Sequence, residues 1–249
     1  MKRTSMFRNG AIALLPALLC VAASAADLKG KFVYDGDAPA AVPVNDPRAA
    51  SDFPNAKILY ENLVVDPASK GIANIVVYVR TDGVAVTPEA EKALAPEVVI
   101  DNKTGQFHPH VAGLWPGKQK LFFQNSDPVG HNSNFAYAGV NPLLPPSAKQ
   151  EIPVAGTKLL PQELSCNIHP WMKAYLVLRE HPYVVATGAD GSFVMKNLPE
   201  GAELEFQVWH EKSGYLEVGD WAKGRFTKTL AAGETDLGEV KVPAALFNK

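Results

Sequence analysis

The sequence contains very little cysteine. Only two cysteines, Cys20 and Cys166, occur in 249 residues, and Cys20 lies within an apolar N-terminal stretch. If that stretch is removed, the single remaining cysteine excludes an internal disulfide and any fold that depends on one. A lone thiol in an exported protein is a buried bystander, a reactive group or a metal ligand. The residues around Cys166 must decide among these three.

Long apolar runs are also missing beyond the N-terminus. Residues 1–26 contain Lys2, Arg3 and Arg8, then an apolar stretch and the small residues 23–25, which predicts a secretory signal peptide. The apolar stretch is shorter than the roughly 20 residues that a membrane-spanning helix needs, and none follows. We expect a periplasmic or secreted protein without a transmembrane segment. A lipid anchor on Cys20 is disfavoured because the residues just before it are not small.

An excess of positive charge is absent as well. The formal net charge is −2, and removal of residues 1–26 takes away three basic side chains and no acid, leaving −5. Nucleic acid is therefore not an expected partner. The sequence has no GxSxG, HExxH, phosphate-loop or dinucleotide motif. We expect no enzyme activity.

Short runs rich in Val, Ile, Phe and Tyr alternate with turn residues along most of the chain. Examples are NIVVYV, KLFFQN, AYLVL and LEFQVW, and the chain has 20 prolines and 19 glycines. This pattern predicts an all-β fold. Helices are predicted only over residues 46–52 and 88–94.

The strongest chemical signal is the spacing of Cys166, His169 and Met172. A thiolate, an imidazole and a thioether separated by three residues on one short loop suit a soft metal ion. Two histidines, one cysteine and a weaker methionine are typical ligands of a copper ion that alternates between Cu(I) and Cu(II). His131, directly after the predicted strand 120–125, supplies the second histidine.

Two other interpretations of the motif leave Met172 unexplained. Zinc accepts cysteine and histidine but gains little from a thioether, so Met172 argues against it. A cysteine nucleophile with a histidine base leaves Met172 without a role. Copper remains the favoured cofactor.

These residues resemble the cupredoxins. A strand ending in Asn125-x-Asp127, then His131-Asn132, then a distant Cys-x-x-His-x-x-Met is similar to that family, and the last spacing matches amicyanin. The resemblance implies a Greek-key β-sandwich and four copper ligands: His131, Cys166, His169 and Met172. It implies that Asn132 ties the ligand loops together and that Trp171 shields the site.

A wider resemblance predicts the domain organisation. Several segments between residues 28 and 215 are similar to exported cupredoxin-like proteins of the methylamine-utilisation-like group. The segment DGSFVMKNLPEG is similar to carboxypeptidase-regulatory-like, or transthyretin-like, β domains, and its Asp190-Gly191 pair predicts a hairpin turn. We therefore expect a signal peptide over 1–26, a copper domain over 27–181 and a smaller β-sandwich over 182–249.

Two further histidines, His108 and His110, lie two residues apart. On a strand they would share a face, where they could form a second metal site or approach the copper. Solvated imidazoles on a loop or half-buried strand are the simpler alternative. His110 is the stronger candidate as an additional ligand.

The expected function is one-electron transfer. We expect a redox protein, such as a dehydrogenase, a cytochrome or an oxidase, to dock on the loop from His169 to Trp171 and to exchange electrons through His169. The main alternative is a copper carrier or buffer without an electron-transfer partner. A third interpretation makes the C-terminal sandwich an adhesion module.

Overall fold

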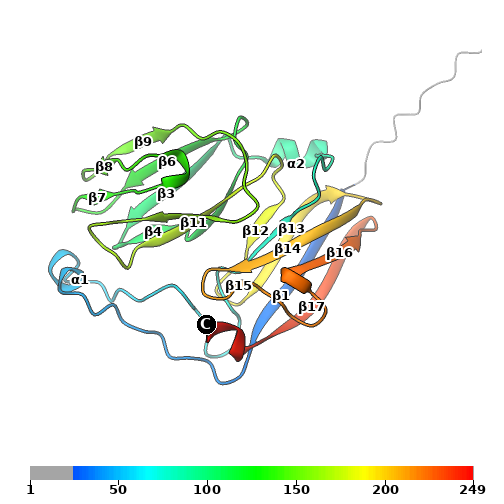
Figure 1. Ribbon diagram of the computed structural model, residues 1–249, viewed down its shortest axis with the longest axis horizontal. Coiled ribbons are helices and arrows are strands. Elements are labelled where there is room, and N and C mark those ends of the chain that lie inside the picture. The colour runs from blue at the N-terminus through cyan, green and yellow to red at the C-terminus, as the bar shows by residue number, and fades with distance from the viewer. Residues whose placement is uncertain (1–24, 249) are drawn as a thin grey trace, which may run out of the picture.

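The computed structural model describes residues 25–248, and its regular secondary structure is mainly β-strand (Figure 1). Its helices are short: α1 (Pro47–Asp52), α2 (Pro88–Ala93), η1 (Ala136–Ala138), η2 (Ala222–Gly224) and η3 (Ala244–Phe247). The predicted all-β fold is confirmed, and α1 and α2 lie where helices were predicted. None of the helices in residues 25–248 could cross a membrane. The predicted signal peptide lies outside the described residues, except for Ala25 and Ala26, which begin the first strand.

The middle of the chain forms one sandwich, called here the central sandwich. Its first sheet has the order β4-β3-β6-β9, and its second has the order β10-β11-β5. The strands of the first sheet are β3 (Glu97–Lys103), β4 (Gln106–His108), β6 (Lys120–Asn125) and β9 (Lys149–Ile152). Those of the second are β5 (Val111–Leu114), β10 (Gln162–Ser165) and β11 (Lys173–Leu178), and β7 (His131–Asn132) pairs with β8 (Leu143–Leu144) at one end.

Both ends of the described chain meet in a second sandwich, called the terminal sandwich. One sheet has the order β13-β1-β17 and consists of β1 (Ala25–Asp35), β13 (Ser192–Pro199) and β17 (Gly233–Pro243). The other has the order β12-β2-β14-β15, with β16 also on β14. Its strands are β2 (Val76–Val79), β12 (Val184–Ala186), β14 (Glu203–His210), β15 (Gly214–Tyr215) and β16 (Arg225–Thr229).

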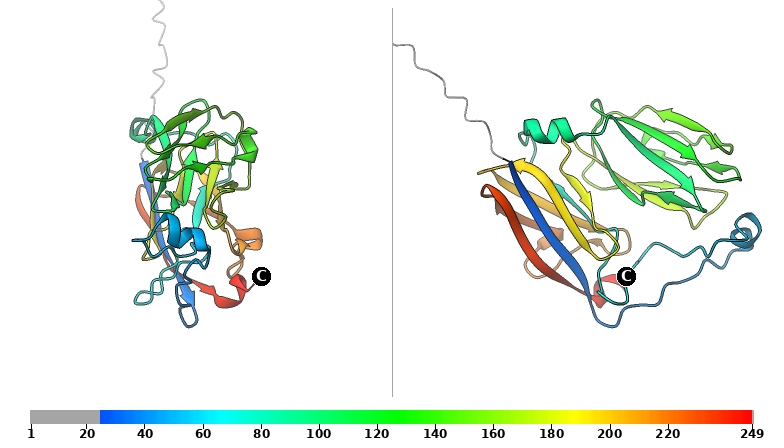
Figure 2. Two further views of the ribbon diagram at one scale, coloured as in Figure 1. Left: turned by 90° about the vertical axis from the view of Figure 1, so that its left-hand side faces the viewer. Right: turned by 180° about the vertical axis from the view of Figure 1, so that it is seen from behind.

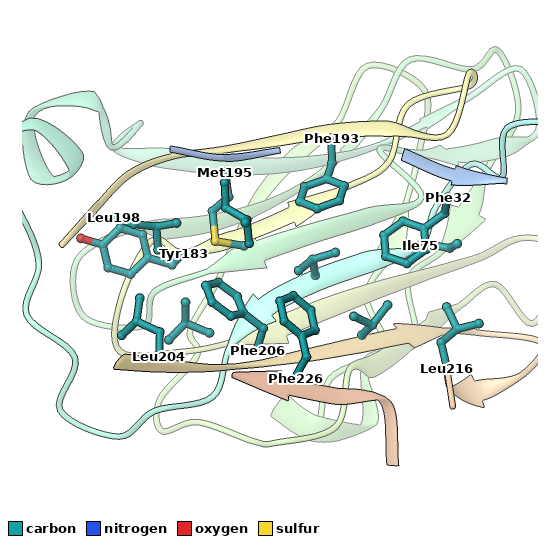
Figure 3. Close-up of a cluster of buried hydrophobic side chains, with 14 of the residues drawn as sticks. Phe32, Ile75, Tyr183, Phe193, Met195, Leu198, Leu204, Phe206, Leu216 and Phe226 are labelled. Carbon is teal, nitrogen blue, oxygen red and sulfur yellow. The ribbon is translucent and has the colours of Figure 1, made fainter. Parts of the chain in front are cut away.

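Alternating apolar residues build the core of the terminal sandwich (Figure 3). Every second residue of β1 from Ala26 to Phe32 is buried, as expected for a strand with one face on a core. Phe32 stacks on Phe193 of the neighbouring β13, and Phe206 stacks on Phe226 across β14 and β16. These rings lie between the two sheets and hold them together.

The strand pairing differs from the linear domain order expected from the sequence. β1 pairs with β13 and β17, and β2 pairs with β12 and β14, so the first two strands lie in the terminal sandwich. The predicted turn at Asp190-Gly191 is present, but the strands it joins belong to different sheets. A Cβ on Gly191 would lie 2.3 Å from the Phe32 carbonyl oxygen, so glycine is required there.

The two sandwiches pack on each other through a third apolar cluster. Val76 and Tyr78 of β2 and Trp209 of β14 face Val111 of β5 and Tyr175 of β11, and all five are buried. The β1–β2 connection leaves the terminal sandwich, carries α1 past one end of the central sandwich and returns (Figure 2). This excursion brings α1 to the loops that contain the predicted ligands.

Candidate metal centre

Three segments meet at one end of the central sandwich. The loop after β6 is folded by Asn125, whose side-chain amide donates to the carbonyls of Val129 (2.8 Å) and Leu144 (2.9 Å). This loop turns His131 inward at the start of β7. The loop from Cys166 to Met172 connects β10 to β11, and α1 lies over its outer side.

Three of the predicted ligands lie together. The Cys166 Sγ atom is 3.9 Å from His131 Nδ1 and 3.8 Å from His169 Nδ1, and the two Nδ1 atoms are 3.0 Å apart. Within residues 25–248, this is the only group of three or more His, Cys, Asp or Glu residues with donor atoms all within 4.8 Å of one another. Both histidines are fully buried, and Cys166 is 2% exposed.

The outer nitrogen of each imidazole faces a carboxylate. His131 Nε2 is 3.0 Å from Asp127 Oδ2, and His169 Nε2 is 3.0 Å from Asp52 Oδ2. A carboxylate accepts a hydrogen bond, so each Nε2 carries the hydrogen and each Nδ1 presents a lone pair inward. Two lone pairs and a thiol then converge on one small space, an arrangement that suits a bound cation.

The surroundings of Cys166 favour the thiolate. Burial raises the pKa of the thiol, but the neighbouring imidazoles of His131 and His169, together with hydrogen bonds from backbone N–H groups, lower it to about 6. The His169 backbone N–H donates to the sulfur at 3.4 Å. The thiolate is the form of cysteine that binds metals.

Met172 closes the same loop. Its backbone N–H donates to the His169 carbonyl (2.9 Å), and its carbonyl accepts from the Cys166 N–H (3.2 Å). The Met172 side chain is fully buried in the apolar cluster that also contains Cys166. These contacts make the seven-residue loop compact and keep the methionine on the inner side.

Asn132 links the two loops that contain the predicted ligands. Its Oδ1 accepts the backbone N–H groups of Asn167 (2.9 Å) and Ile168 (3.1 Å), and its own backbone N–H also lowers the pKa of Cys166. Trp171 packs against His169 with ring centroids 5.1 Å apart, and its indole N–H donates to the Gly105 carbonyl. Both residues hold the loops that contain the predicted ligands in place.

Sequence reasoning assigned no role to Asp127, Asp52 and Phe53. Asp127 belongs to the Asn125-x-Asp127 motif, and its backbone partners Thr104 and Gly105 hold it beside His131. Burial raises the pKa of Asp127, but these bonds and His131 lower it overall. Asp52 and Phe53 lie more than one hundred residues before His169, and only the pairing of distant strands brings them there.

The interpretation that His108 and His110 share a strand face is not what the structure shows. β4 ends at His108, which is exposed, whereas His110 is buried. His110 lies outside the donor cluster, with Nδ1 3.5 Å from Glu61 Oε2 and Nε2 3.4 Å from Glu211 Oε1. Burial lowers the pKa of His110, but the two carboxylates raise it to about 9. His110 therefore forms an ion-pair junction between the sandwiches.

Comparison with known proteins gives a partial match. No family model matches the chain, and no curated protein does. Among solved structures, amicyanin from Paracoccus versutus matches 41% of this chain and 97% of its own, at 14% identity and a TM-score of 0.30. A Cu(I) form of an amicyanin variant (14% identity) and the oxidised state of another (15%) each match 41% of this chain and 98% of their own, also at a TM-score of 0.30. At these values the comparison gives no information about function.

Proposed function

We propose that this chain is an exported mononuclear copper protein that carries single electrons and binds copper through His131, Cys166, His169 and Met172. The observation that carries the proposal is the convergence of two Nδ1 atoms and one Sγ within 3.9 Å of one another, with a carboxylate on the far side of each imidazole. A copper ion bound there would take up and release one electron as it alternates between Cu(I) and Cu(II).

The donor set supports copper over zinc. Zinc sites in proteins are built from cysteine, histidine and carboxylate ligands, and a thioether adds little to them. Here the fully buried Met172 belongs to the same loop as two of the donors, while both nearby carboxylates bind the outer imidazole nitrogens instead. The groups left facing inward are the soft and borderline donors that copper prefers.

The protein would keep the donors in place when the charge of the site changes. Asp127 and Asp52 fix the orientation of the two imidazoles, and Asn132 holds the loop from Cys166 to Met172 against β7. The donors are buried and mutually supported, so little movement is needed when an electron arrives. Such rigidity favours fast electron exchange.

The partner would be a redox protein docked on the ligand loop. The His169 ring, through which the sequence predicted electron exchange, is fully buried beneath Asp52 and Phe53. The exposed groups of the loop are Asn167, Ile168 and Pro170, and Ile168 is 36% exposed. We propose that a dehydrogenase, a cytochrome or an oxidase of the periplasm or extracellular space contacts these residues.

The alternative function is copper storage or delivery. A carrier must surrender Cu(I) to an acceptor, whereas a redox protein must keep it through many turnovers. Mixing the copper-loaded protein with a Cu(I) chelator and, separately, with a one-electron oxidant separates the two. Fast oxidation with the copper retained supports electron transfer, whereas rapid loss of Cu(I) to the chelator supports the carrier.

A further inference from the structure

Residues 46–53, called here the α1 cap, come from the connection between two strands of the terminal sandwich. The connection leaves β1, reaches the donor end of the central sandwich at α1 and returns to β2 (Figure 2). Pro47 opens the helix, and Asp46 caps it by accepting the Arg48 backbone N–H at 2.9 Å. The cap is thus an ordered element placed over the site by the other sandwich.

Three side chains of the α1 cap contact the ligand residues or their loop. The Arg48 guanidinium donates to the Ile168 carbonyl at 2.5 Å, and Asp52 Oδ2 lies 3.0 Å from His169 Nε2. The buried ring of Phe53 stacks on the His131 ring, with ring centroids 6.1 Å apart, and contacts the His169 ring edge-on, with ring centroids 5.5 Å apart. Together they cover the outer edge of His169, which has no exposed surface.

Asp52 is placed to act through His169. Ser51 donates to the other carboxylate oxygen, Oδ1, at 2.8 Å, so both oxygens of Asp52 are held. A carboxylate on the outer nitrogen of a metal-binding histidine fixes its tautomer and makes the inner nitrogen a stronger donor. Its negative charge also stabilises the more highly charged state of a nearby metal.

We propose that Asp52 is a positioning residue for His169, and that the α1 cap shields this ligand from solvent and favours Cu(II) over Cu(I). The redox part rests on the proposed copper function, whereas the positioning of the ring does not. A redox partner that approaches this side of the site would meet the α1 cap before it could reach the His169 ring.

The first test compares copper-loaded wild type with Asp52→Asn. The amide can still accept a hydrogen bond but lacks the charge. At a fixed solution potential, the ratio of Cu(I) to Cu(II) should be about tenfold higher in Asp52→Asn, which is about 59 mV for a one-electron couple. Asp37→Asn makes the same change at an exposed position of the same connection and should match wild type. An unchanged ratio in Asp52→Asn would overturn the redox part of the proposal.

The second test follows the His169 Nε2–H proton by NMR, before metal is added and after loading with Cu(I). In wild type this proton should exchange slowly with water, and in Asp52→Ala at least about tenfold faster, with Asp37→Ala as the control. Free exchange in wild type, or equal exchange rates in wild type and Asp52→Ala, would overturn the proposal that Asp52 and the α1 cap protect His169. The wild-type measurement decides this even if a variant does not fold.

The two tests separate the cap from the proposed function. If the protein shows no thiolate-to-copper absorption but the His169 proton is protected by Asp52, the copper function fails and the positioning role stands. If the absorption is present but the proton exchanges freely, the copper function stands and the proposed shielding of His169 by the α1 cap is wrong.

Discussion

The Nδ1 atoms of His131 and His169 lie 3.0 Å apart, and the Nε2 atom of each ring contacts a carboxylate. With Asp127 and Asp52 accepting at the outer nitrogens, both inner nitrogens present lone pairs, so a shared proton or a metal ion must separate them. The Cys166 sulfur, less than 4 Å from each, adds a third electron-rich atom. The folded chain thus collects electron-rich atoms at one point, and a cation there relieves their repulsion.

Metal binding should therefore stabilise the folded protein. A ligand that binds only the native state adds about 2.7 kcal/mol to the free energy of unfolding at 100 times its Kd. We expect Cu(I) at about 100 times its Kd to raise the free energy of unfolding of wild type by this amount, measured by chemical denaturation. His131→Ala should lose most of the rise, whereas His108→Ala, which changes an exposed histidine outside the cluster, should keep it. Equal stabilisation of both variants would place the copper elsewhere.

Asn132 should determine how firmly the ligand loops are joined. Asn132→Leu keeps the approximate size but leaves the backbone N–H groups of Asn167 and Ile168 without their acceptor. We expect a loss of about 1–3 kcal/mol in unfolding free energy, and weaker copper binding. Chemical denaturation and copper titration measure these effects. Asn141→Ala, which removes only the outer partner of the Asn132 amide, should cost less.

The His110 junction should make stability depend on pH above neutrality. The pKa of His110 is raised from 6.5 to about 9 by Glu211 and Glu61, against the effect of burial. A raised folded-state pKa gives stability that is fully present below pH 6.5 and is lost as the pH rises through 9. The loss in the free energy of unfolding is about 3 kcal/mol at most, because each pKa unit between the unfolded and folded states corresponds to about 1.4 kcal/mol.

Urea denaturation of wild type and Glu211→Gln between pH 6 and 9.5 isolates this effect. Cys166, with a pKa lowered to about 6, shifts stability in the opposite direction over this range, so the difference between the two proteins is the quantity to follow. The stability difference should shrink as the pH rises. Glu200→Gln, at an exposed turn, should give no such trend, and a constant difference for Glu211→Gln would refute the ion-pair junction.

The packing of the two sandwiches should make them unfold together. A Cβ on Gly113 of β5 would lie 2.7 Å from Val184 Cβ of β12, across the contact between the sandwiches. We expect Gly113→Ala to cost about 1–3 kcal/mol by overpacking. Gly188→Ala, where the nearest atom is 3.4 Å away, should be nearly neutral. Calorimetry should show one unfolding transition, and its midpoint temperature should be lowered only in Gly113→Ala. Two independent transitions would contradict the apolar cluster shared by the sandwiches.

The sequence revealed those parts of the site that lie close together along the chain. The spacing of Cys166, His169 and Met172 on one short loop, and the position of His131 after a strong strand, were sufficient to predict a cluster of donors. The same local patterns predicted α1, α2 and strands such as β2, β6, β11 and β14. Such features depend on neighbouring residues, which periodicity and turn chemistry can describe.

Contacts between distant segments could not be predicted in this way. Asp52 is 117 residues from His169, and nothing in the sequence around it distinguishes it from other acids on short helices. The pairing of β1 with β13 and β17 likewise depends on which strands meet, and an alternating pattern does not name its partner. His110 was singled out as a ligand candidate, but Glu61 and Glu211, which flank it, come from other parts of the chain.

The most direct test of the copper site is the visible absorption and electron paramagnetic resonance spectrum of the Cu(II)-loaded protein, in wild type and in Cys166→Ala. We predict an intense thiolate-to-copper band in wild type that is lost in Cys166→Ala. Absence of this band in wild type, or its persistence in the variant, would contradict a copper site built on Cys166.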